Sequence, residues 1–303
     1  MKRAKNSNAT SHSMQPAGRH TLLCPLSGRI VRSILCGLVV STFALIAQAW
    51  ACNDGPLPEG ATKLGFTRLA FNICPNVSDI SMDGRGDSAK LYNGVWWDKA
   101  VPPKSLYTDN ADGSLSISFG GALATVPRTM TPGALPLLRG TDGFFVEFEV
   151  SLSDNDHDHF PAVWLMPIEH NQRLDDSYQP DERGFERWIE IDVDEGGFAP
   201  GPMGTAISWS GTWPNYTRVR SNPDLYNQRI DRSHRHKFAA GFDPKTLTIT
   251  FWHDDKIQYV AKGESVPEIA RKQNFYVIMN AASHKLNLPY TMNVYGVRAF
   301  IPN

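Results

Sequence analysis

Cysteine is scarce in this sequence: only four occur among 303 residues, and Cys24 and Cys36 lie in the first fifty. The remaining two, Cys52 and Cys74, can pair in one way, and an oxidising compartment would favour that disulfide. Two unpaired thiols are the alternative if the chain is not exported. So few cysteines exclude a small disulfide-stapled scaffold, and a chain of this length buries a full core without such staples.

An excess of charge of one sign is also lacking, since 30 Lys and Arg face 31 Asp and Glu, for a net charge of −1. Such a chain has no global field that would attract nucleic acid or an anionic membrane. No phosphate loop, no Cys/His zinc spacing and no Gly-x-Ser-x-Gly turn occurs. We therefore expect no nucleic-acid partner, and we assign no residue to a metal site.

The first 51 residues are predicted to be a signal peptide. Basic residues precede an apolar run over 34–47, and Ala49-Trp50-Ala51 follows, with small residues where a signal peptidase cuts. The run is short for a membrane-spanning helix, which needs roughly 20 residues, although an uncleaved anchor is the alternative. We expect a secreted or periplasmic protein without membrane contact, whose residues 52–303 form one monomeric domain.

Long amphipathic helical patterns are rare, whereas aromatic residues make up 11% of the chain. One short helix is predicted at 266–272. Residues 52–110 are rich in Gly, Pro, Asn and Asp and are expected to be mostly loop with short strands. Two long connections, 168–186 and 210–236, are expected to be functional loops. Period-2 alternation predicts strands at 114–119, 143–152, 162–166, 187–193, 205–209, 237–241, 247–252, 257–260, 275–280 and 292–301. Together these features predict an all-β fold, a two-sheet antiparallel β-sandwich of the jelly-roll kind.

The predicted strand at 188–195 has the sequence WIEIDVDE, which places carboxylates at unusual positions. Alternation puts its Ile and Val side chains on the core face and Trp188, Glu190 and Asp192 on the other face. A row of like charges costs stability, because neighbouring carboxylates repel each other. An open groove in which the carboxylates perform chemistry would explain why the fold retains them.

Simple alternation would turn Glu195 into the core and leave Asp194 in the groove. A one-residue β-bulge at Val193-Asp194 would reverse both directions, and bulges are common beside active sites. The bulge would bring Glu195 onto the same face as Glu190 and Asp192. We predict this bulge, with Asp194 in place of Glu195 as the alternative if no bulge forms.

Five segments, in order along the chain, carry a family resemblance. Residues 190–195, EIDVDE, match the bulged signature Glu-x-Asp-x-x-Glu of glycoside hydrolase family 16. Residues 160–167, FPAVWLMP, resemble the Trp-Pro-Ala-x-Trp-Leu strand of that family, and 143–147 resembles the strand before it. Residues 251–256 and 292–300 resemble a later hairpin and the final strand. The sequence is therefore similar to this family over about residues 110–302.

The resemblance implies a concanavalin A-like jelly roll with a concave glycan-binding cleft. It implies Glu190 as nucleophile, Glu195 as acid/base and Asp192 as the assisting carboxyl group. No cofactor is required, and a structural calcium ion is compatible with the family, although Tyr295 stands where its final strand often has Asp. The expected function is retaining hydrolysis of internal β-glycosidic bonds in a polysaccharide. A non-catalytic glycan-binding protein and a transglycosylase are the alternatives.

Aromatic side chains near the acidic strand are candidates for sugar binding, because aromatic faces suit the apolar faces of pyranoses. We assign Trp188, Trp209 and Trp213 to substrate binding, with core or loop packing as the alternative for the last two. Trp164 is predicted to pack, and at most one of the adjacent Trp96 and Trp97 can face a groove.

Two polar clusters have both a functional and a structural interpretation. Residues 154–159, DNDHDH, could bind a cation but are more typical of a solvated turn. We expect His159 to flank the cleft and assign it to substrate binding. The arginines between 218 and 235 could bind an anionic glycan, or they pair with nearby acidic residues.

Overall fold

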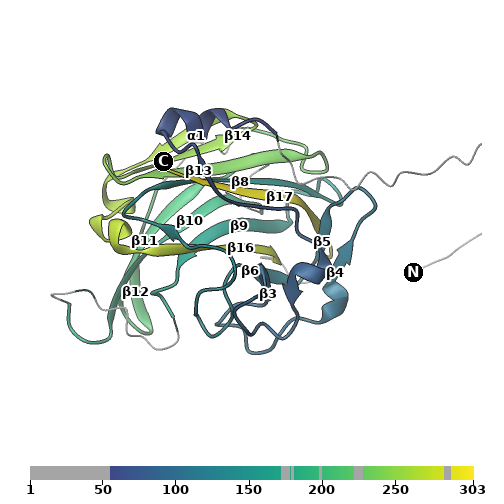
Figure 1. The fold of residues 1–303 in the computed structure, drawn as a ribbon, viewed down its shortest axis with the longest axis horizontal. Helices are drawn as coiled ribbons and strands as arrows, with labels where there is room; N and C mark the ends of the chain where they lie inside the picture. Colours follow the sequence, from purple (N-terminus) through teal and green to yellow (C-terminus); the bar gives the residue numbers. More distant parts are fainter. Residues whose placement is uncertain (1–54, 172–177, 179–180, 198–199, 222–227, 283–287) are drawn as a thin grey trace, which may run out of the picture. The chain divides into compact units, whose positions relative to one another are not determined.

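Two stacked β-sheets make up the part of the chain described by the computed structural model, residues 55–171, 178, 181–197, 200–221, 228–282 and 288–303 (Figure 1). The predicted signal peptide, residues 1–51, and Cys52 lie outside the described residues. Cys74 is disulfide-bonded, and its pairing with Cys52 stays a prediction. Among the described residues, no helix has the length and apolar character needed to span a bilayer.

The first sheet has eight strands among the described residues, in the order β15-β14-β13-β8-β17-β5-β4, with β1 added beside β17. All of its strand pairs are antiparallel. The strands are β1 (Arg68–Ile73), β4 (Tyr107–Asp109), β5 (Leu115–Ser118), β8 (Phe144–Leu152), β13 (His236–Asp243), β14 (Thr248–His253), β15 (Lys256–Ala261) and β17 (Thr291–Ile301).

The second sheet has nine strands among the described residues, in the order β12-β11-β10-β9-β16-β6-β3-β2, with β7 added beside β16. Its pairs are antiparallel except β2 with β3. The strands are β2 (Ile80–Ser81), β3 (Leu91–Asn93), β6 (Ala122–Ala124), β7 (Leu138–Arg139), β9 (Phe160–Pro167), β10 (Phe185–Glu195), β11 (Thr205–Thr212), β12 (Asn215–Arg220) and β16 (Asn274–Ala282).

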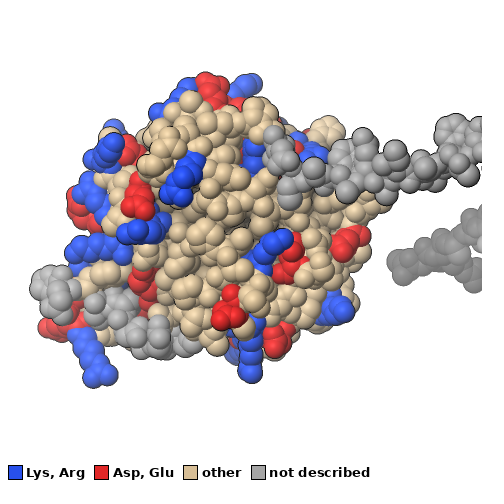
Figure 2. All heavy atoms as spheres, viewed as in Figure 1, with Lys and Arg blue, Asp and Glu red and all other residues tan. Residues whose placement is uncertain are grey.

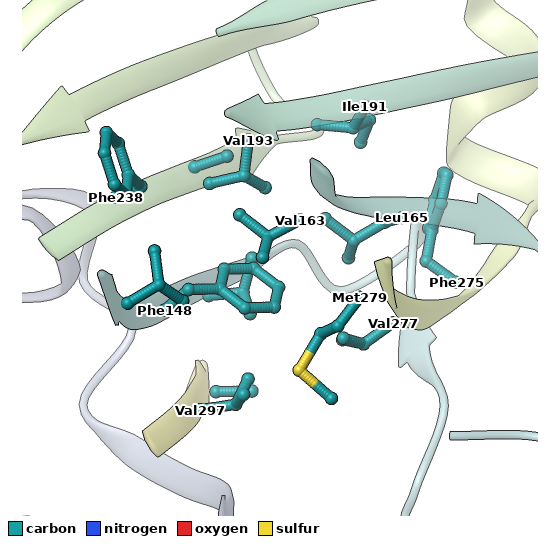
Figure 3. Packing of buried hydrophobic residues seen from close by; sticks show 14 of the residues in the cluster. Phe148, Val163, Leu165, Ile191, Val193, Phe238, Phe275, Val277, Met279 and Val297 are labelled. Atoms are coloured by element: carbon teal, nitrogen blue, oxygen red, sulfur yellow. The ribbon is translucent and has the colours of Figure 1, made fainter. Parts of the chain in front are cut away.

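The main hydrophobic core lies between the sheets, where alternate side chains of both meet. Figure 3 shows Val163, Leu165 and Ile191 from the nine-stranded sheet near Phe148 and Val297 from the eight-stranded sheet. Leu165 and Phe148 are 0% exposed. Truncating a buried Leu of this kind typically costs about 2–5 kcal/mol, so this layer fixes which face of each strand points outward.

The outer face of the eight-stranded sheet is covered by α1 (Glu59–Leu64). Phe145 and Trp252 pack there with Ala61, in a second apolar cluster. A Cβ at Gly60 would lie 2.7 Å from Phe145, so this contact requires glycine. Figure 1 shows α1 above β13 and β14, on the side away from β10 and β9. The outer face of the nine-stranded sheet therefore remains as the place for a binding groove.

Figure 2 shows Lys, Arg, Asp and Glu interspersed around one face of the domain, with neither sign gathered there. This agrees with the near-zero net charge of the sequence. Such a surface is typical of a protein whose specificity comes from a local site and not from long-range attraction.

The predicted all-β sandwich is confirmed, and each of the ten predicted strands overlaps an observed one. Three predictions need correction. Residues 266–272 do not form an α-helix but the short 3-10 helix Glu268–Lys272. Part of the predicted loop 210–236 is β12, which extends the sheet beside β11. The region 52–110 contains α1, which an N-terminal Pro58 and a left-handed Gly65 delimit. The other 3-10 helices are Val77–Asp79, Lys104–Leu106 and Gly263–Ser265.

Candidate active site

Strand β10 presents its carboxylates as the sequence pattern predicts. Ile189, Ile191 and Val193 are at most 2% exposed and belong to the core between the sheets. Glu190 and Asp192 therefore point to the outer face of the nine-stranded sheet. Asp192 lies opposite Trp164 of β9 and Thr205 of β11, so the acidic row runs along the middle of the sheet.

The predicted β-bulge is present in β10. Asp192 is paired with Trp164 of β9, whereas Asp194 is paired with Val163, so one residue of β10 has no partner between them. The shift leaves Val193 and Asp194 both on the core side. Glu195 consequently returns to the outer face, where its carboxylate lies 3.6 Å from the Arg220 guanidinium.

Asp194 is fixed inside the sandwich by Arg232. The Arg232 guanidinium donates to both carboxylate oxygens of Asp194, and both side chains are at most 5% exposed. The backbone N–H of Met203 donates to the same carboxylate, and the Arg232 guanidinium also donates to the Gly201 carbonyl. Asp194 therefore does not share the outer face with Glu190, which removes the unbulged alternative.

Burial and mutual repulsion raise the pKa values of the three outer-face carboxyl groups. Burial, followed by the charges of Glu190 and Glu195, raises the pKa of Asp192 well above its ordinary value. Burial, with repulsion from Glu190, raises the pKa of Glu195 to about 7. Burial also raises the pKa of Glu190, against hydrogen bonds from Trp209 and Asp192. The three carboxyl groups therefore titrate as one coupled system, and Asp192 is the group that retains its proton to the highest pH.

Donors around Glu190 favour its ionised form. The Trp209 indole N–H donates to Glu190 Oε2 at 3.0 Å. Arg218 lies over the Trp209 ring, 5.5 Å from its centroid, and the charges of Arg218 and Arg220 lower the pKa of Glu190. One buried oxygen of Asp192, Oδ2, has no donor directed at it. A proton on this carboxyl group lets it donate to Glu190 in place of repelling it.

Trp188 is positioned differently from its predicted role. It is only 5% exposed, because the His170 ring stacks on it at 3.7 Å and Trp209 lies nearly parallel at 5.7 Å. The Tyr216 ring meets it edge-on at 4.8 Å. Trp188 therefore supports Trp209 and does not offer a free face to a sugar, which corrects the assignment of Trp188 to substrate binding.

His159 also departs from its predicted place beside the cleft. It is 4% exposed, stacks on Tyr290 at 4.4 Å and contacts Asp154 Oδ1 at 2.8 Å. This position corrects the assignment of His159 to substrate binding. Within residues 154–159, all of which are described, no group of three metal-ligand side chains converges. The acidic turn thus orients a packed histidine.

Trp209 and Trp213 retain the exposure that sugar binding requires. Trp209 is partly buried beside Glu190, whereas Trp213 at the β11–β12 turn is 66% exposed. The Tyr216 ring lies 6.0 Å from Trp213 and links it to the stack over Trp188. On this side of β10, aromatic rings therefore extend from the acidic row to the edge of the sheet.

A cleft of about 440 Å³ lies on the other side of β10, over β9 and β16. Trp97, Trp164 and Asn280 line it, and Trp97 is 41% exposed. The Trp164 indole donates to Asn280 at 2.8 Å, and its ring lies 5.8 Å from Trp97. The prediction that Trp164 packs in the core missed this role. The alternation of β9, with Val163 and Leu165 facing inward, already placed Trp164 on the outer face.

The arginines of the 218–235 segment divide into two groups. Arg218 and Arg220 face the site from β12. Arg232 binds Asp194 in the interior, and Arg235 binds Glu149 at 2.6 Å. Pairing with nearby acidic residues is therefore confirmed for Arg220, Arg232 and Arg235, whereas binding of an anionic glycan stays a prediction.

Solved structures with a similar fold were found, while the sequence matches no family model and no curated protein. The laminarinase from Flavobacterium sp. UMI-01 is 14% identical, covering 77% of this chain and 100% of that chain, with a TM-score of 0.45. LamAcat from Zobellia galactanivorans is 12% identical over 78% of this chain and 98% of that chain, with a TM-score of 0.49. SCLam, a non-specific endo-β-1,3(4)-glucanase from family GH16, is 16% identical over 77% and 90%, with a TM-score of 0.45.

One of these neighbours, SCLam, comes from the family that the sequence motifs resemble. What these neighbours act on is a property of those proteins.

Replacing Arg232 with Met should destabilise the domain by about 3–5 kcal/mol, because it leaves the Asp194 carboxylate buried without its partner. Urea unfolding followed by tryptophan fluorescence measures this change. Arg235→Met is the matched control: its side chain is 44% exposed, so its pair with Glu149 should be worth less than about 1 kcal/mol. Equal losses for the two variants would contradict the proposed interior role of Arg232.

Proposed function

We propose that this protein is a retaining glycoside hydrolase that cleaves internal β-glycosidic bonds of a polysaccharide. The observation that carries the proposal is the bulged acidic strand, on which Glu190, Asp192 and Glu195 share one face. Retaining hydrolysis needs two carboxyl groups on either side of one bond, with one ionised and the other protonated. Hydrogen bonds and nearby arginines favour the ionised form of Glu190 against the effect of its burial, whereas burial and repulsion raise the pKa of Glu195 to about 7.

In the first step, the Glu190 carboxylate attacks the anomeric carbon of the sugar. Glu195, whose pKa of about 7 keeps it partly protonated near neutral pH, gives its proton to the departing glycosidic oxygen. The bond from the anomeric carbon to that oxygen breaks, and a glycosyl ester of Glu190 forms. The electron pair of the broken bond leaves with the protonated oxygen.

In the second step, Glu195 is a carboxylate and removes a proton from water. The water oxygen attacks the anomeric carbon from the side of Glu195, and the bond to Glu190 breaks. Two inversions give net retention of the β configuration. Esterification removes the charge of Glu190, whose repulsion raises the pKa of Glu195. The pKa of Glu195 therefore falls, and Glu195 is ionised when it must accept the proton of water.

Asp192 is the group that connects the two glutamates. It is 1% exposed, and its carboxyl group lowers the pKa of both glutamates by hydrogen bonding. A protonated Asp192 can donate to Glu190 while Glu190 carries charge, and to the Glu195 carboxylate once Glu190 is esterified. Its role is to stabilise whichever glutamate is ionised in each step.

The preference for internal bonds is supported by binding surfaces on both sides of the acidic strand. Trp209 and Trp213 lie toward β12, and the cleft lined by Trp97 and Trp164 lies toward β16. A sugar bound over Glu190 would therefore have neighbours in both directions along a polymer. Export and action as a monomer remain part of the proposal and rest on the sequence.

Purified protein should release reducing ends from at least one polymer in a panel of β-glucans, galactans and sulfated galactans. Glu190→Ala and Glu195→Ala should each lower kcat/KM by at least about 10³-fold, because each removes a group that bonds to reacting atoms. Glu264→Gln, a change at an exposed acid, serves as the control and should leave the rate unchanged.

Added azide distinguishes the two roles on an activated aryl glycoside. It should restore turnover of Glu190→Ala with an α-glycosyl azide as product, because azide enters on the vacated face of the sugar. With Glu195→Ala the product should be the β-glycosyl azide, formed from the glycosyl ester. Binding of a glycan by the wild-type protein without any release of reducing ends would instead support a non-catalytic glycan-binding protein.

The dependence of kcat/KM on pH should be bell-shaped, with an alkaline limb near pH 7. Activity falls as pH rises through the raised pKa of Glu195, about 7, because the proton donor is lost. Arg220 lowers the pKa values of both glutamates, so Arg220→Met should move both limbs to higher pH. Arg220→Lys should keep them in place, and an alkaline limb that is the same in all three proteins would contradict this assignment.

A further inference from the structure

Three ligand-type side chains converge on the eight-stranded sheet, away from the acidic strand: His236 at the start of β13, His253 at the end of β14, and Asp254 in the turn to β15. His253 lies opposite Phe238 in the sheet register, and Phe238 belongs to the core. His253, and His236 two residues before Phe238, therefore lie on the inner side of the sheet at its edge. None of the three has a role in the proposed hydrolysis.

The distances between the three donor atoms match one face of a small coordination polyhedron. His236 Nδ1 lies 2.8 Å from Asp254 Oδ2 and 3.1 Å from His253 Nε2. His253 Nε2 lies 3.2 Å from Asp254 Oδ2. A tetrahedral zinc ion with bonds of about 2.0–2.1 Å has ligand atoms roughly 3.3 Å apart. Three donors at nearly this spacing can contact one ion and leave a fourth position for water.

Neighbouring backbone groups orient two of the donors. His236 Nε2 lies 3.0 Å from the carbonyl of Asp231, and since a carbonyl only accepts, Nε2 carries the hydrogen. Nδ1 is then the nitrogen available to an ion held between the three side chains, which is the arrangement of metal-bound histidines. The Lys237 N–H donates to Asp254 Oδ1 at 2.9 Å, so the other oxygen, Oδ2, points to the histidines.

We propose that His236, His253 and Asp254 form a binding site for a late first-row divalent cation of the zinc type. Two imidazoles and one carboxylate are donors that zinc and its neighbours prefer, whereas calcium prefers oxygen ligands only. The negative charge of the Asp254 carboxylate offsets part of the charge of the divalent cation, and the imidazoles bind the ion as neutral ligands. The ion would connect the start of β13 to the β14–β15 turn.

The cationic side chains near this site have partners of their own. Arg232 lies over the Phe238 ring, 5.6 Å from its centroid. Its charge is compensated by the buried ion pair with Asp194. Lys237 is directed toward Asp255, 3.8 Å away. The Phe238 ring lies 5.3 Å from that of His253 and gives the site an apolar floor.

Titration calorimetry with Zn²⁺ tests the proposal on the purified chain, prepared without a histidine tag and treated with a chelator. We expect one Zn²⁺ per chain and a rise in Tm on binding. Cobalt(II), used in place of zinc, should give the strong visible absorption of a four-coordinate site with nitrogen and oxygen ligands. Absence of stoichiometric Zn²⁺ binding, or of this absorption, would overturn the proposal.

Matched variants locate the ion. His253→Gln and Asp254→Asn should weaken Zn²⁺ binding by on the order of 100-fold, because each removes a direct ligand. His234→Ala and Asp255→Asn change exposed neighbours of the same types and should bind as the wild type does. The cobalt spectrum of the unmodified chain stays decisive if a variant fails to fold. Equal affinity in all four variants would place the bound ion elsewhere and reject this site.

Discussion

The geometry of the site depends on the buried ion pair between Asp194 and Arg232. Both groups are almost fully enclosed, so neither can leave the interior without stranding the other. The pair keeps Asp194 on the core side of β10, immediately after Val193, and two successive inward residues define the bulge. Glu195 must then point outward. An ion pair in the core thereby determines that the Glu195 carboxylate points to the outer face of the sheet.

The acidic row imposes a cost on the same strand. Burial raises the pKa of Glu195 from 4.5 to about 7, so the folded state binds a proton more tightly than the unfolded chain. The destabilisation is absent below pH 4.5, develops as pH rises toward 7, and is on the order of a few kcal/mol above it. The hydrophobic layer that Leu165 and Ile191 share between the sheets must offset this cost. Stability and reactivity thus change with pH through the same carboxyl group.

Much of this arrangement could be predicted from the sequence. Alternation in β10 identified the outward face of Glu190 and Asp192, and the resemblance to a bulged family signature predicted the bulge. The partner of Asp194 could not be predicted, because Arg232 is 38 residues away and only the fold brings them together. Trp188 and His159 were assigned to substrate binding because a sequence pattern does not show which rings pack over a side chain. In the fold, the ring of His170 stacks on Trp188, and that of Tyr290 stacks on His159. The exposed aromatic Trp97 lies in a loop, where no periodicity applies.

The stereochemistry of the first product tests the central claim most directly. If the bulge brings Glu195 and Glu190 close enough for double displacement, with carboxyl groups about 5–5.5 Å apart, the newly formed reducing end is the β anomer. Proton NMR recorded in the first minutes of cleavage, before mutarotation, distinguishes the two anomers. We expect the β anomer as the first product. The α anomer as first product would mean a single displacement by water, and would contradict the nucleophilic role of Glu190 and the geometry derived from the bulge.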